Sequence, residues 1–321
     1  MNTPGFSDRL VGGWVSLRDV LTDAERRLAS AGVPSPRADA AILASHVLGV
    51  PRSRMLLHDG VTPEQRTAFE RLLSRRMARI PLQHLLGSTT FRHLDLAVGP
   101  GVFVPRPETE LVAEAGITEL MGCPADKRIA VDLCAGSAAL ALALATEVPG
   151  AQVTAVEIDP TAADWARKNI EVLRPEIDDH GSDVTLVVGD ARSIAESGAP
   201  LADLAGRVDV VVTNPPYIPE DATPTEPEVR DHEPSIALFG GPDGLDVVRD
   251  LLGTAARLLR PGGLVVIEHA DRQGEAAGDA GVPWLLREGE DALDWEQVRD
   301  HLDLSRRPRF TTARRTARIA G

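Results

Sequence analysis

One short stretch, Asn214-Pro215-Pro216-Tyr217, combines residue types that can present a flat nitrogen group to an electrophile. An amide or aryl amine nitrogen is a poor nucleophile because its lone pair is delocalised. Two acceptors, the Asn214 side-chain carbonyl and the Pro215 backbone carbonyl, can hold its two N–H groups and stabilise the positive charge of the transition state. Tyr217, the single tyrosine of the chain, would form a wall against the flat group. The alternative is a plain Pro-Pro turn with an Asn cap.

The residues before this stretch predict the element that positions it. Residues 208–213 form a run rich in valine, which is typical of a buried strand in a parallel sheet. The two prolines end the strand because they have no N–H for the ladder. Open α/β sheets bind ligands beyond the carboxyl ends of their strands, and Asn214 and Tyr217 fall at that position.

A second strand end carries a turn of small residues. Residues 129–133 predict a strand that ends in Asp132-Leu133, and the turn that follows lets a ligand lie against backbone N–H groups at a helix N-terminus. The turn consists of Cys134, Ala135, Gly136, Ser137 and Ala138. A single glycine-rich turn is a weak signal on its own.

Two further strand ends carry acids. Glu157 ends the strand predicted at 152–157 and lies 25 residues after Asp132, a spacing that suits a carboxylate bound to the ribose of a nucleoside-containing cofactor. After the strand at 184–188, Asp190 and Ala191 are placed to meet an adenine ring, whose exocyclic amine would donate a hydrogen bond to the carboxylate. One such acid is more often a capping or solvated residue. Three strand ends in register favour a binding site.

Other chemistries explain less of the sequence. A nicotinamide-dependent oxidoreductase would share the turn and Glu157 but would leave Asn214–Tyr217 without a role. The sequence has no metal-ligand cluster, no Ser–His–Asp set and no Cys nucleophile with a His partner. Transfer from a self-activated donor, with no metal, fits best.

Length and composition restrict the class of protein. A chain of 321 residues predicts two domains, and no apolar run is long enough for a membrane span. The N-terminus lacks the pattern of a signal peptide. Cys123 and Cys134, the only cysteines, provide no disulfide framework. We therefore expect a cytoplasmic protein, with no membrane partner.

Charge is unevenly distributed along the chain. Residues 1–90 contain 12 Arg and 8 acidic residues, whereas residues 91–303 contain 16 basic and 40 acidic residues. The tail from Leu304 contains six Arg and no acid. The acidic central region disfavours direct nucleic-acid binding, which needs long-range attraction to phosphates.

The N-terminal third predicts helices followed by a hairpin. Apolar residues recur at helical spacing over 14–80, and Thr62-Pro63 is a good helix start. The helix after it carries four arginines that are either a solvated face or a docking surface for an acidic or nucleic-acid-bearing partner: Arg71, Arg75, Arg76 and Arg79. Leu94, Leu96 and Val98 alternate before Gly99-Pro100-Gly101, which predicts a β-hairpin that turns there into 102–104.

The remainder alternates strands and helices. Helices are predicted from 107 to about 120, over 139–147, from Pro160 to Leu173 and over 245–259, with a turn at 261–263 before a strand at 264–268. Residues 295–302 and 309–313 are expected to be final, antiparallel strands. The pattern predicts an α/β fold with a mostly parallel sheet.

Further motifs identify a resemblance. The chain resembles the class I S-adenosylmethionine-dependent methyltransferases, and within them the protein-(glutamine-N5) methyltransferases of peptide-chain release factors. The resemblance extends over nearly the whole chain. The motifs are Pro81-Leu-Gln-His-Leu-Leu-Gly87, Phe103-Val-Pro-Arg-Pro-Glu-Thr-Glu110, Asn214-Pro-Pro-Tyr217, Arg230-Asp-His-Glu-Pro234, Ala237-Leu238, Asp243-Gly-Leu-Asp246, Gly262-Gly263, Glu268-His269 and Gln273-Gly274.

The resemblance implies a fold and a division of the chain. It implies a Rossmann-like, mostly parallel seven-stranded sheet after a helical bundle and a β-hairpin linker. Residues 1–80 would recognise the release factor, residues 81–106 would be the hinge, and residues 107–321 would be the catalytic domain. A monomer is expected.

The resemblance also implies site residues. Asp132 and the turn from Cys134 to Ala138 would hold the methionine part of S-adenosylmethionine, Glu157 its ribose, and Asp190 with Ala191 its adenine. Asn214, next to the donor, and Pro215 would orient the glutamine amide of a Gly-Gly-Gln tripeptide, with Pro216 and Tyr217 against it, and the donor would leave as S-adenosylhomocysteine. Cys134 and Ala138 stand where the motif commonly has glycine. We expect Ala138 to matter more, because its methyl group would narrow the approach to the donor.

Two alternatives stay open beside release-factor methylation. One is amino-methylation of a base in RNA or DNA, which shares the Asn214–Tyr217 motif. The other is an adaptor, either donor-binding or without a donor, which the two replaced glycines suggest.

Overall fold

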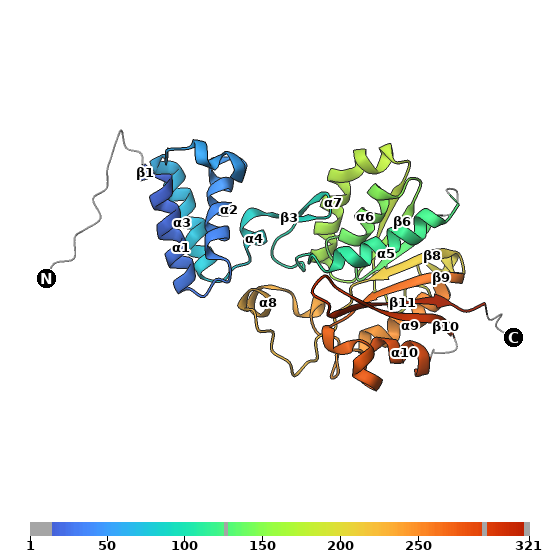
Figure 1. Ribbon diagram of the computed structural model, residues 1–321. Coiled ribbons are helices and arrows are strands. Elements are labelled where there is room, and N and C mark those ends of the chain that lie inside the picture. The colour runs from blue at the N-terminus through green and yellow to red at the C-terminus, as the bar shows by residue number, and fades with distance from the viewer. Residues whose placement is uncertain (1–14, 125–127, 291–293, 318–321) are drawn as a thin grey trace. The chain divides into compact units, whose positions relative to one another are not determined.

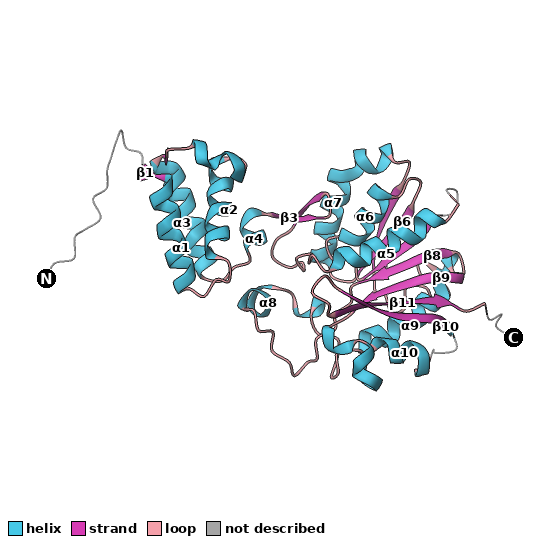
Figure 2. Ribbon diagram, in the orientation of Figure 1, coloured by secondary structure: helices cyan, strands magenta, loops and turns pink. Residues whose placement is uncertain are grey.

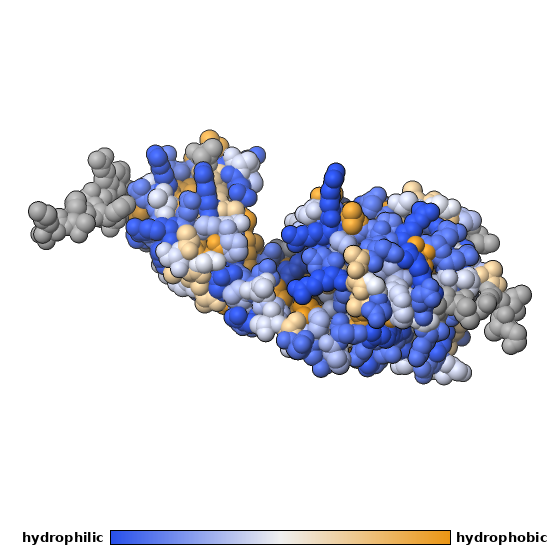
Figure 3. Space-filling view, turned by 60° about the horizontal axis from the view of Figure 1, so that its bottom comes forward, coloured by the Kyte–Doolittle hydropathy of each residue, from blue (hydrophilic) through white to orange (hydrophobic). Residues whose placement is uncertain are grey.

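The computed structural model describes residues 15–124, 128–290 and 294–317, and these form two compact units (Figure 1). A helical unit contains the described residues up to Gly87 together with Thr225–His232. An α/β unit contains the described residues of 88–224 and 233–317. Both units have predominantly hydrophilic surfaces in the view of Figure 3, with apolar residues scattered among polar ones.

Three helices form the core of the helical unit. They are α1 (Leu17–Ser30), α2 (Pro36–Leu48) and α3 (Pro63–Met77), and α4 (Leu82–Leu86) follows them. The short strands β1 (Val15–Ser16), before α1, and β2 (Gly60–Val61), before α3, pair with each other. Leu28, Leu43, Phe69 and Leu73 are completely or almost completely buried between them. The cap predicted at Thr62 is confirmed, because its hydroxyl accepts from the Gln65 N–H while the Gln65 side chain accepts from the Thr62 N–H.

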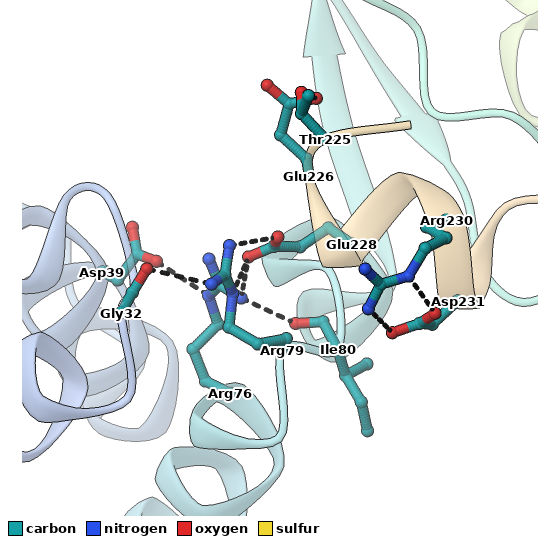
Figure 4. Close-up of polar contacts among 10 residues, drawn as sticks. All are labelled: Gly32, Asp39, Arg76, Arg79, Ile80, Thr225, Glu226, Glu228, Arg230 and Asp231. Atoms are coloured by element: carbon teal, nitrogen blue, oxygen red, sulfur yellow. Dashed lines mark hydrogen bonds and ion pairs between the residues drawn. The ribbon is translucent and has the colours of Figure 1, made fainter. Parts of the chain in front are cut away.

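A segment distant in sequence completes this unit. Helix α8 (Pro227–His232) brings Glu228 to Arg76 and Arg79 of the helical unit (Figure 4). Glu228 Oε1 lies 2.7 Å from Arg76 Nη1 and from Arg79 Nε, and Arg76 Nε donates to Asp39 Oδ2 at 2.8 Å. Burial alone would raise the pKa of Glu228, but the hydrogen bonds from Arg79 and Arg76 lower it to about 2.

This arrangement corrects the interpretation of the arginines on α3. Arg76 is buried and Arg79 is half-buried, and both bind Glu228, so neither belongs to a solvated face or an open docking surface. Arg71 and Arg75 are exposed. The missing information was Glu228, which lies about 150 residues further along the chain and which helical periodicity cannot reveal.

The α/β unit contains the seven-stranded sheet that the sequence predicts (Figure 2). Its strand order is β10-β11-β9-β8-β5-β6-β7. The strands from β9 to β7 run parallel, and β10 and β11 are antiparallel additions at one edge. Their bounds are β5 (Ile129–Leu133), β6 (Gln152–Glu157), β7 (Asp183–Val188), β8 (Val208–Thr213), β9 (Leu259–Glu268), β10 (Trp295–Leu302) and β11 (Pro308–Arg315).

Helices cover both faces of this sheet (Figure 1). Helices α5 (Thr109–Gly122), α6 (Ala139–Glu147) and α7 (Pro160–Asp179) share an apolar core with Ala130, Val153 and Val210. Helices α9 (Asp246–Leu258) and α10 (Val282–Glu288) share the opposite core with Val131 and Val211. The alternation of inward-facing residues along β5 and β8 explains why two layers of helices are needed. Short 3-10 helices occur at Arg52–Leu57, Ala202–Leu204, Ser235–Ala237, Asp271–Gln273 and Glu275–Ala280.

The predicted hairpin exists, but its predicted turn is wrong. Strands β3 (Ser88–Phe91) and β4 (Leu94–Ala97) pair across Arg92-His93, not across Gly99–Gly101, and residues 102–104 form no strand. Arg92 has φ 53°, and its backbone N–H donates to Glu110 Oε1 at 2.9 Å while its guanidinium pairs with Glu147. Tertiary ion pairs therefore hold a turn that has none of the usual turn residues.

Two element ends also differ from prediction. Helix α7 continues past Leu173 and through Pro175 to Asp179, where Ile177 is fully buried in the core. Strand β9 begins at Leu259, five residues before the predicted start, because the residues of the predicted turn form an irregularity in its pairing with β8. No helix among the described residues is long and apolar enough to cross a membrane.

Candidate active site

The strand register brings the predicted site residues to one edge of the sheet. Leu133, the last residue of β5, pairs with Val156 on one side and with Thr213 on the other. The residues that follow these strands, Cys134 and Asn214, therefore start at the same level. Strands β6 and β7 continue to one side of β5, while β8 and β9 continue to the other, so the edge lies at the point where strand order reverses. Open α/β sheets bind ligands at such a point.

The turn after β5 is strained. Cys134, Gly136 and Ala138 have φ values of 65°, 56° and 66°. The left-handed region costs an L-residue about 1–2 kcal/mol, and glycine pays none of this. The two positions where glycine is replaced are therefore those that require positive φ. Ala138 is fully buried in the apolar core, whereas a Cβ added at Gly136 would meet no atom within 4 Å. Open space in this turn thus lies beside Gly136.

Asp132 is enclosed beneath this turn. Its Oδ2 accepts from the Ala141 N–H at 3.0 Å, and its Oδ1 is buried without a hydrogen-bond partner among the described residues. Burial is the main reason that its pKa rises to about 8, and the charge of Glu157 contributes in the same direction. An unpaired buried carboxyl oxygen is suited to a cationic group, because a neighbouring positive charge would favour its charged form.

Glu157 braces the same turn from the next strand. Its Oε2 accepts from the Gly136 N–H at 2.7 Å and its Oε1 accepts from the Asp159 N–H at 2.8 Å. Burial raises its pKa, against the effect of these backbone hydrogen bonds. Each oxygen keeps a further lone pair, which a ribose hydroxyl can use.

Asp190 makes its main contacts with Arg192. Its carboxylate binds the Arg192 guanidinium at 2.7 Å (Oδ2 to Nη2) and 3.0 Å (Oδ1 to Nε), and this hydrogen bonding lowers its pKa. Ala191 beside it is buried. An adenine amine would therefore share the carboxylate with Arg192. The sequence did not indicate that this acid is already paired.

The acceptor stretch is fixed by a hydrogen bond from the start of α5. Asn214 Nδ2 donates to Thr109 Oγ1 at 3.2 Å. Neither Asn214 Oδ1 nor the Pro215 carbonyl accepts a hydrogen bond from the residues that the structure describes. Pro215 and Pro216 are buried, and Asn214 is half-buried. The two acceptors that the sequence predicts are thus both available.

Tyr217 joins this stretch to the end of β9. Its hydroxyl lies 3.5 Å from Glu268 Oε1, and burial raises its pKa, so the hydroxyl remains protonated. Glu268 is 1% exposed, and burial raises its pKa to about 7. The neighbouring Thr109 hydroxyl and Arg309 favour its charged form.

Three residues from a later segment contact the backbone of Pro216 and Tyr217. Gln273 Nε2 donates to the Tyr217 carbonyl at 3.0 Å. A Cβ at Gly240 would lie 2.4 Å from the Pro216 carbonyl oxygen, and one at Gly244 would lie 2.3 Å from that of Tyr217. Only glycine fits at these two positions. Sequence reasoning did not assign these supporting roles, although Gln273 and Gly244 lie within the motifs of the resemblance.

The described part of the chain contains no group of three or more His, Cys, Asp or Glu arranged to hold a metal ion. His269, next to Glu268, is fully buried, with its Nδ1 2.9 Å from the Ala270 carbonyl and its Nε2 2.9 Å from Thr311 Oγ1. Both ring nitrogens therefore have partners in the protein, which agrees with a structural role.

Known proteins match both units. The PrmC N-terminal domain model matches residues 19–87, and the Methyltransferase small domain model matches residues 117–227. A release factor glutamine methyltransferase of Streptomyces coelicolor is 48% identical, over 92% of this chain and 96% of its own. The chain belongs to the release factor glutamine methyltransferase family.

Other members of this family show the same extent of similarity. The Mycolicibacterium smegmatis release factor glutamine methyltransferase is 45% identical over 94% of this chain and 99% of its own. That of Bifidobacterium longum is 40% identical over 85% of this chain and 97% of its own. Membership confirms the resemblance drawn from the motifs and identifies the chain as a methyltransferase of the class that uses S-adenosylmethionine.

Proposed function

We propose that this protein transfers a methyl group from S-adenosylmethionine to the side-chain amide nitrogen of the glutamine in the Gly-Gly-Gln motif of class 1 release factors. One observation carries the proposal. Asn214 gives its NH₂ group to Thr109 and keeps its Oδ1 available beside the Pro215 carbonyl, at the carboxyl edge of the sheet. Two acceptors are what a primary amide needs for its two N–H groups.

The acceptor residues act mainly in the transition state. As the glutamine nitrogen attacks, it gains positive charge, and hydrogen bonds to Asn214 Oδ1 and the Pro215 carbonyl become stronger. Tyr217, with Pro216, supplies a wall for the flat amide. After transfer the nitrogen loses a proton to water, so no catalytic base is required.

The donor side fits the same proposal. When bound, S-adenosylmethionine supplies a methyl group activated by a sulfonium centre. The unpaired Asp132 Oδ1 suits its ammonium group, and the open space at Gly136 suits the approach of its methionine part. Around it, Cys134, Ala135, Ser137 and Ala138 would complete the turn. Glu157 would bind the ribose, and Asp190 and Ala191 the adenine, with S-adenosylhomocysteine as the product and no metal ion in the reaction.

We assign the remaining roles by region. Residues 1–80 would dock the release factor, residues 81–106 would serve as the hinge, and residues 107–321 would perform the transfer. The protein would act as a cytoplasmic monomer without binding nucleic acid directly. The excess of acidic residues over 91–303 supports the last point.

A methyl-acceptor assay with labelled donor tests the proposal. Purified release factor, RNA and DNA are offered separately to the protein, and label is expected in the release factor alone. Transfer to nucleic acid alone would favour the base-methylating alternative. Calorimetry addresses the adaptor alternative, because an adaptor that has lost its donor site would bind no S-adenosylmethionine even at millimolar concentration.

A further inference from the structure

One buried side chain next to the Tyr217 backbone uses both ends of its amide within the protein. Gln273 is the last residue of the 3-10 helix Asp271–Gln273, and it is 6% exposed. Its Nε2 donates to the Tyr217 carbonyl at 3.0 Å, and its Oε1 accepts from the Ala270 N–H at 3.0 Å. Two such hydrogen bonds restrict a buried amide to one position.

The two partners allow only one orientation of the Gln273 amide. A backbone N–H can only donate a hydrogen bond, and a backbone carbonyl can only accept one. The flipped amide would therefore place its NH₂ group against the Ala270 N–H and its oxygen against the Tyr217 carbonyl. Gln273 thus keeps a donor directed at the Tyr217 carbonyl oxygen.

Ala270, to which the Gln273 side chain is bound, is itself fixed to the sheet. Its carbonyl accepts from the Gln273 N–H at 2.9 Å and lies 2.9 Å from Nδ1 of the fully buried His269. The other ring nitrogen of His269 lies 2.9 Å from Thr311 Oγ1, and the His269 N–H donates to the Arg309 carbonyl at 2.9 Å. Thr311 and Arg309 both belong to β11, so the sheet determines where the Gln273 amide lies.

The residues before Tyr217 explain why its backbone needs such an anchor. Pro215 and Pro216 have no N–H, so ladder hydrogen bonds cannot hold this stretch. Thr213, the last residue of β8, pairs with both neighbouring strands, and the sheet therefore fixes the start of the stretch. The hydrogen bond from Gln273 fixes its end.

The hydrogen bond between Gln273 and Tyr217 also depends on a glycine. A Cβ at Gly244 would lie 2.3 Å from the Tyr217 carbonyl oxygen and 3.0 Å from Gln273 Nε2. Any larger residue would therefore have to displace the backbone of Tyr217. The absence of a side chain at Gly244 allows the Gln273 amide and the Tyr217 carbonyl to meet.

We propose that Gln273 is a positioning residue that sets where the Tyr217 side chain lies beside the acceptor amide. The inference rests on the proposed function, in which Tyr217 forms a wall against the flat amide of the glutamine. Both ends of the Gln273 amide have partners in the protein, so Gln273 acts through Tyr217 and not on the substrate. Its effect is expected in turnover, while the donor side, built on β5 and β6, stays unchanged.

The decisive variant is Gln273→Met, because methionine fills a similar volume without either hydrogen bond. Its turnover number with a Gly-Gly-Gln peptide is expected to fall about tenfold or more, with donor affinity by calorimetry within about twofold of wild type. Gln152→Met is the matched control and should keep wild-type turnover, because Gln152 is exposed at the start of β6, at the opposite edge of the sheet. Full turnover in Gln273→Met, or loss of donor affinity together with turnover, would overturn the proposal.

Two further variants separate positioning from a general structural effect. In a Tyr217→Ala background, Gln273→Met is expected to cost no further turnover, because the ring that Gln273 positions is gone. Gly244→Ala should lower turnover as Gln273→Met does, since its methyl group would displace the Tyr217 carbonyl from the amide. An additive loss in the double variant, or wild-type turnover in Gly244→Ala, would contradict the inference.

A readout without activity comes from Tyr217 itself, the single tyrosine of the chain. Protein labelled with ¹³C at the tyrosine ring gives NMR signals from this ring alone. The signals are expected to be sharp in wild type and broadened by exchange on the microsecond-to-millisecond timescale in Gln273→Met. Equally sharp signals in both proteins would count against a positioning role.

These outcomes are distinct from failure of the proposed function. If wild-type protein does not methylate the Gly-Gly-Gln peptide or the intact release factor, the proposed function fails, and the NMR measurement still tests whether Gln273 fixes the Tyr217 ring. If wild-type protein methylates glutamine and Gln273→Met does so equally well, only the positioning role fails.

Discussion

The two halves of the candidate site follow neighbouring strands but are held in place by different contacts. Residues 134–138, the turn proposed to bind the donor (the donor turn), follow β5, and residues 214–217, the stretch proposed to bind the acceptor (the acceptor stretch), follow β8, at paired positions of neighbouring strands. The donor turn keeps its shape through its own backbone, with Cys134, Gly136 and Ala138 at positive φ. The acceptor stretch is held by contacts from α5, β9 and the glycines of a later segment.

This difference indicates where each half is sensitive to change. Strain in the donor turn is local, so a substitution there should alter the conformation of the turn and its affinity for the donor together. The acceptor geometry is determined by several distant contacts, so loss of one supporting group should disturb orientation before it disturbs the fold. Substitutions in the donor turn should therefore change donor affinity, whereas substitutions around the acceptor stretch should change turnover.

The largest effect is expected from Asn214→Ala. Loss of the Oδ1 acceptor should lower turnover about 100- to 1000-fold, because the hydrogen bond is strongest in the transition state. Donor affinity by calorimetry should stay within about twofold. Unchanged turnover in this variant would refute the role of Asn214.

A smaller effect, on the other half, is expected from Gly136→Ala. The new methyl group would enter the open space where the donor is proposed to lie, and donor affinity should fall at least about tenfold. Gly181→Ala is the matched control, since Gly181 also has positive φ and open space but precedes β7 at the opposite edge of the sheet. Equal donor affinity in both variants would exclude Gly136 from the donor site.

Turnover should also depend on the ionisation of Glu268. Its pKa is raised by burial to about 7, with Thr109, Arg309 and Tyr217 acting to lower it and Glu108 to raise it. The carboxylate is charged above this value, and the charged form is the stronger acceptor for the Tyr217 hydroxyl, which lies 3.5 Å from its Oε1. Turnover should therefore rise up to about tenfold from pH 6 to pH 8, and this rise should be absent in Tyr217→Phe. A rise of the same size in that variant would show that another group causes the pH dependence.

The smallest effect is expected in stability. Cys134→Gly should raise the free energy of unfolding by about 0.5–1 kcal/mol, because relief of the positive-φ strain exceeds the extra entropy of glycine in the unfolded chain. Cys134→Ser keeps the strain and should give no increase. Chemical denaturation measures both, and an equal or lower stability of the glycine variant would show that the turn is not strained at Cys134.

Strand periodicity was sufficient to predict the sheet and the edge where the site lies. Valine-rich runs such as 208–213 predict buried strands of a parallel sheet. The polar residues that follow such strands then lie at one edge of the sheet. The turn at Arg92-His93 escaped prediction because ion pairs with distant acids stabilise it. The ion pairs of Glu228 could not be predicted for the same reason, since Glu228 binds arginines that are distant in sequence.

Within the site, the sequence identified groups but not their partners. Asn214 was placed at the strand end from local pattern alone. That Thr109 fixes its amide, and that Arg192 already binds Asp190, depends on contacts between segments that no local pattern contains. The complete burial of Ala138 in the apolar core likewise depends on packing between segments.

Tandem mass spectrometry of an intact release factor, incubated with the protein and S-adenosylmethionine, tests the central claim most directly. It reports donor use, acceptor and site in one measurement. The proposed function predicts one added methyl group on the side-chain amide of the Gly-Gly-Gln glutamine, and its loss with the Asn214→Ala variant. An unmodified glutamine, or a methyl group at another residue, would contradict it.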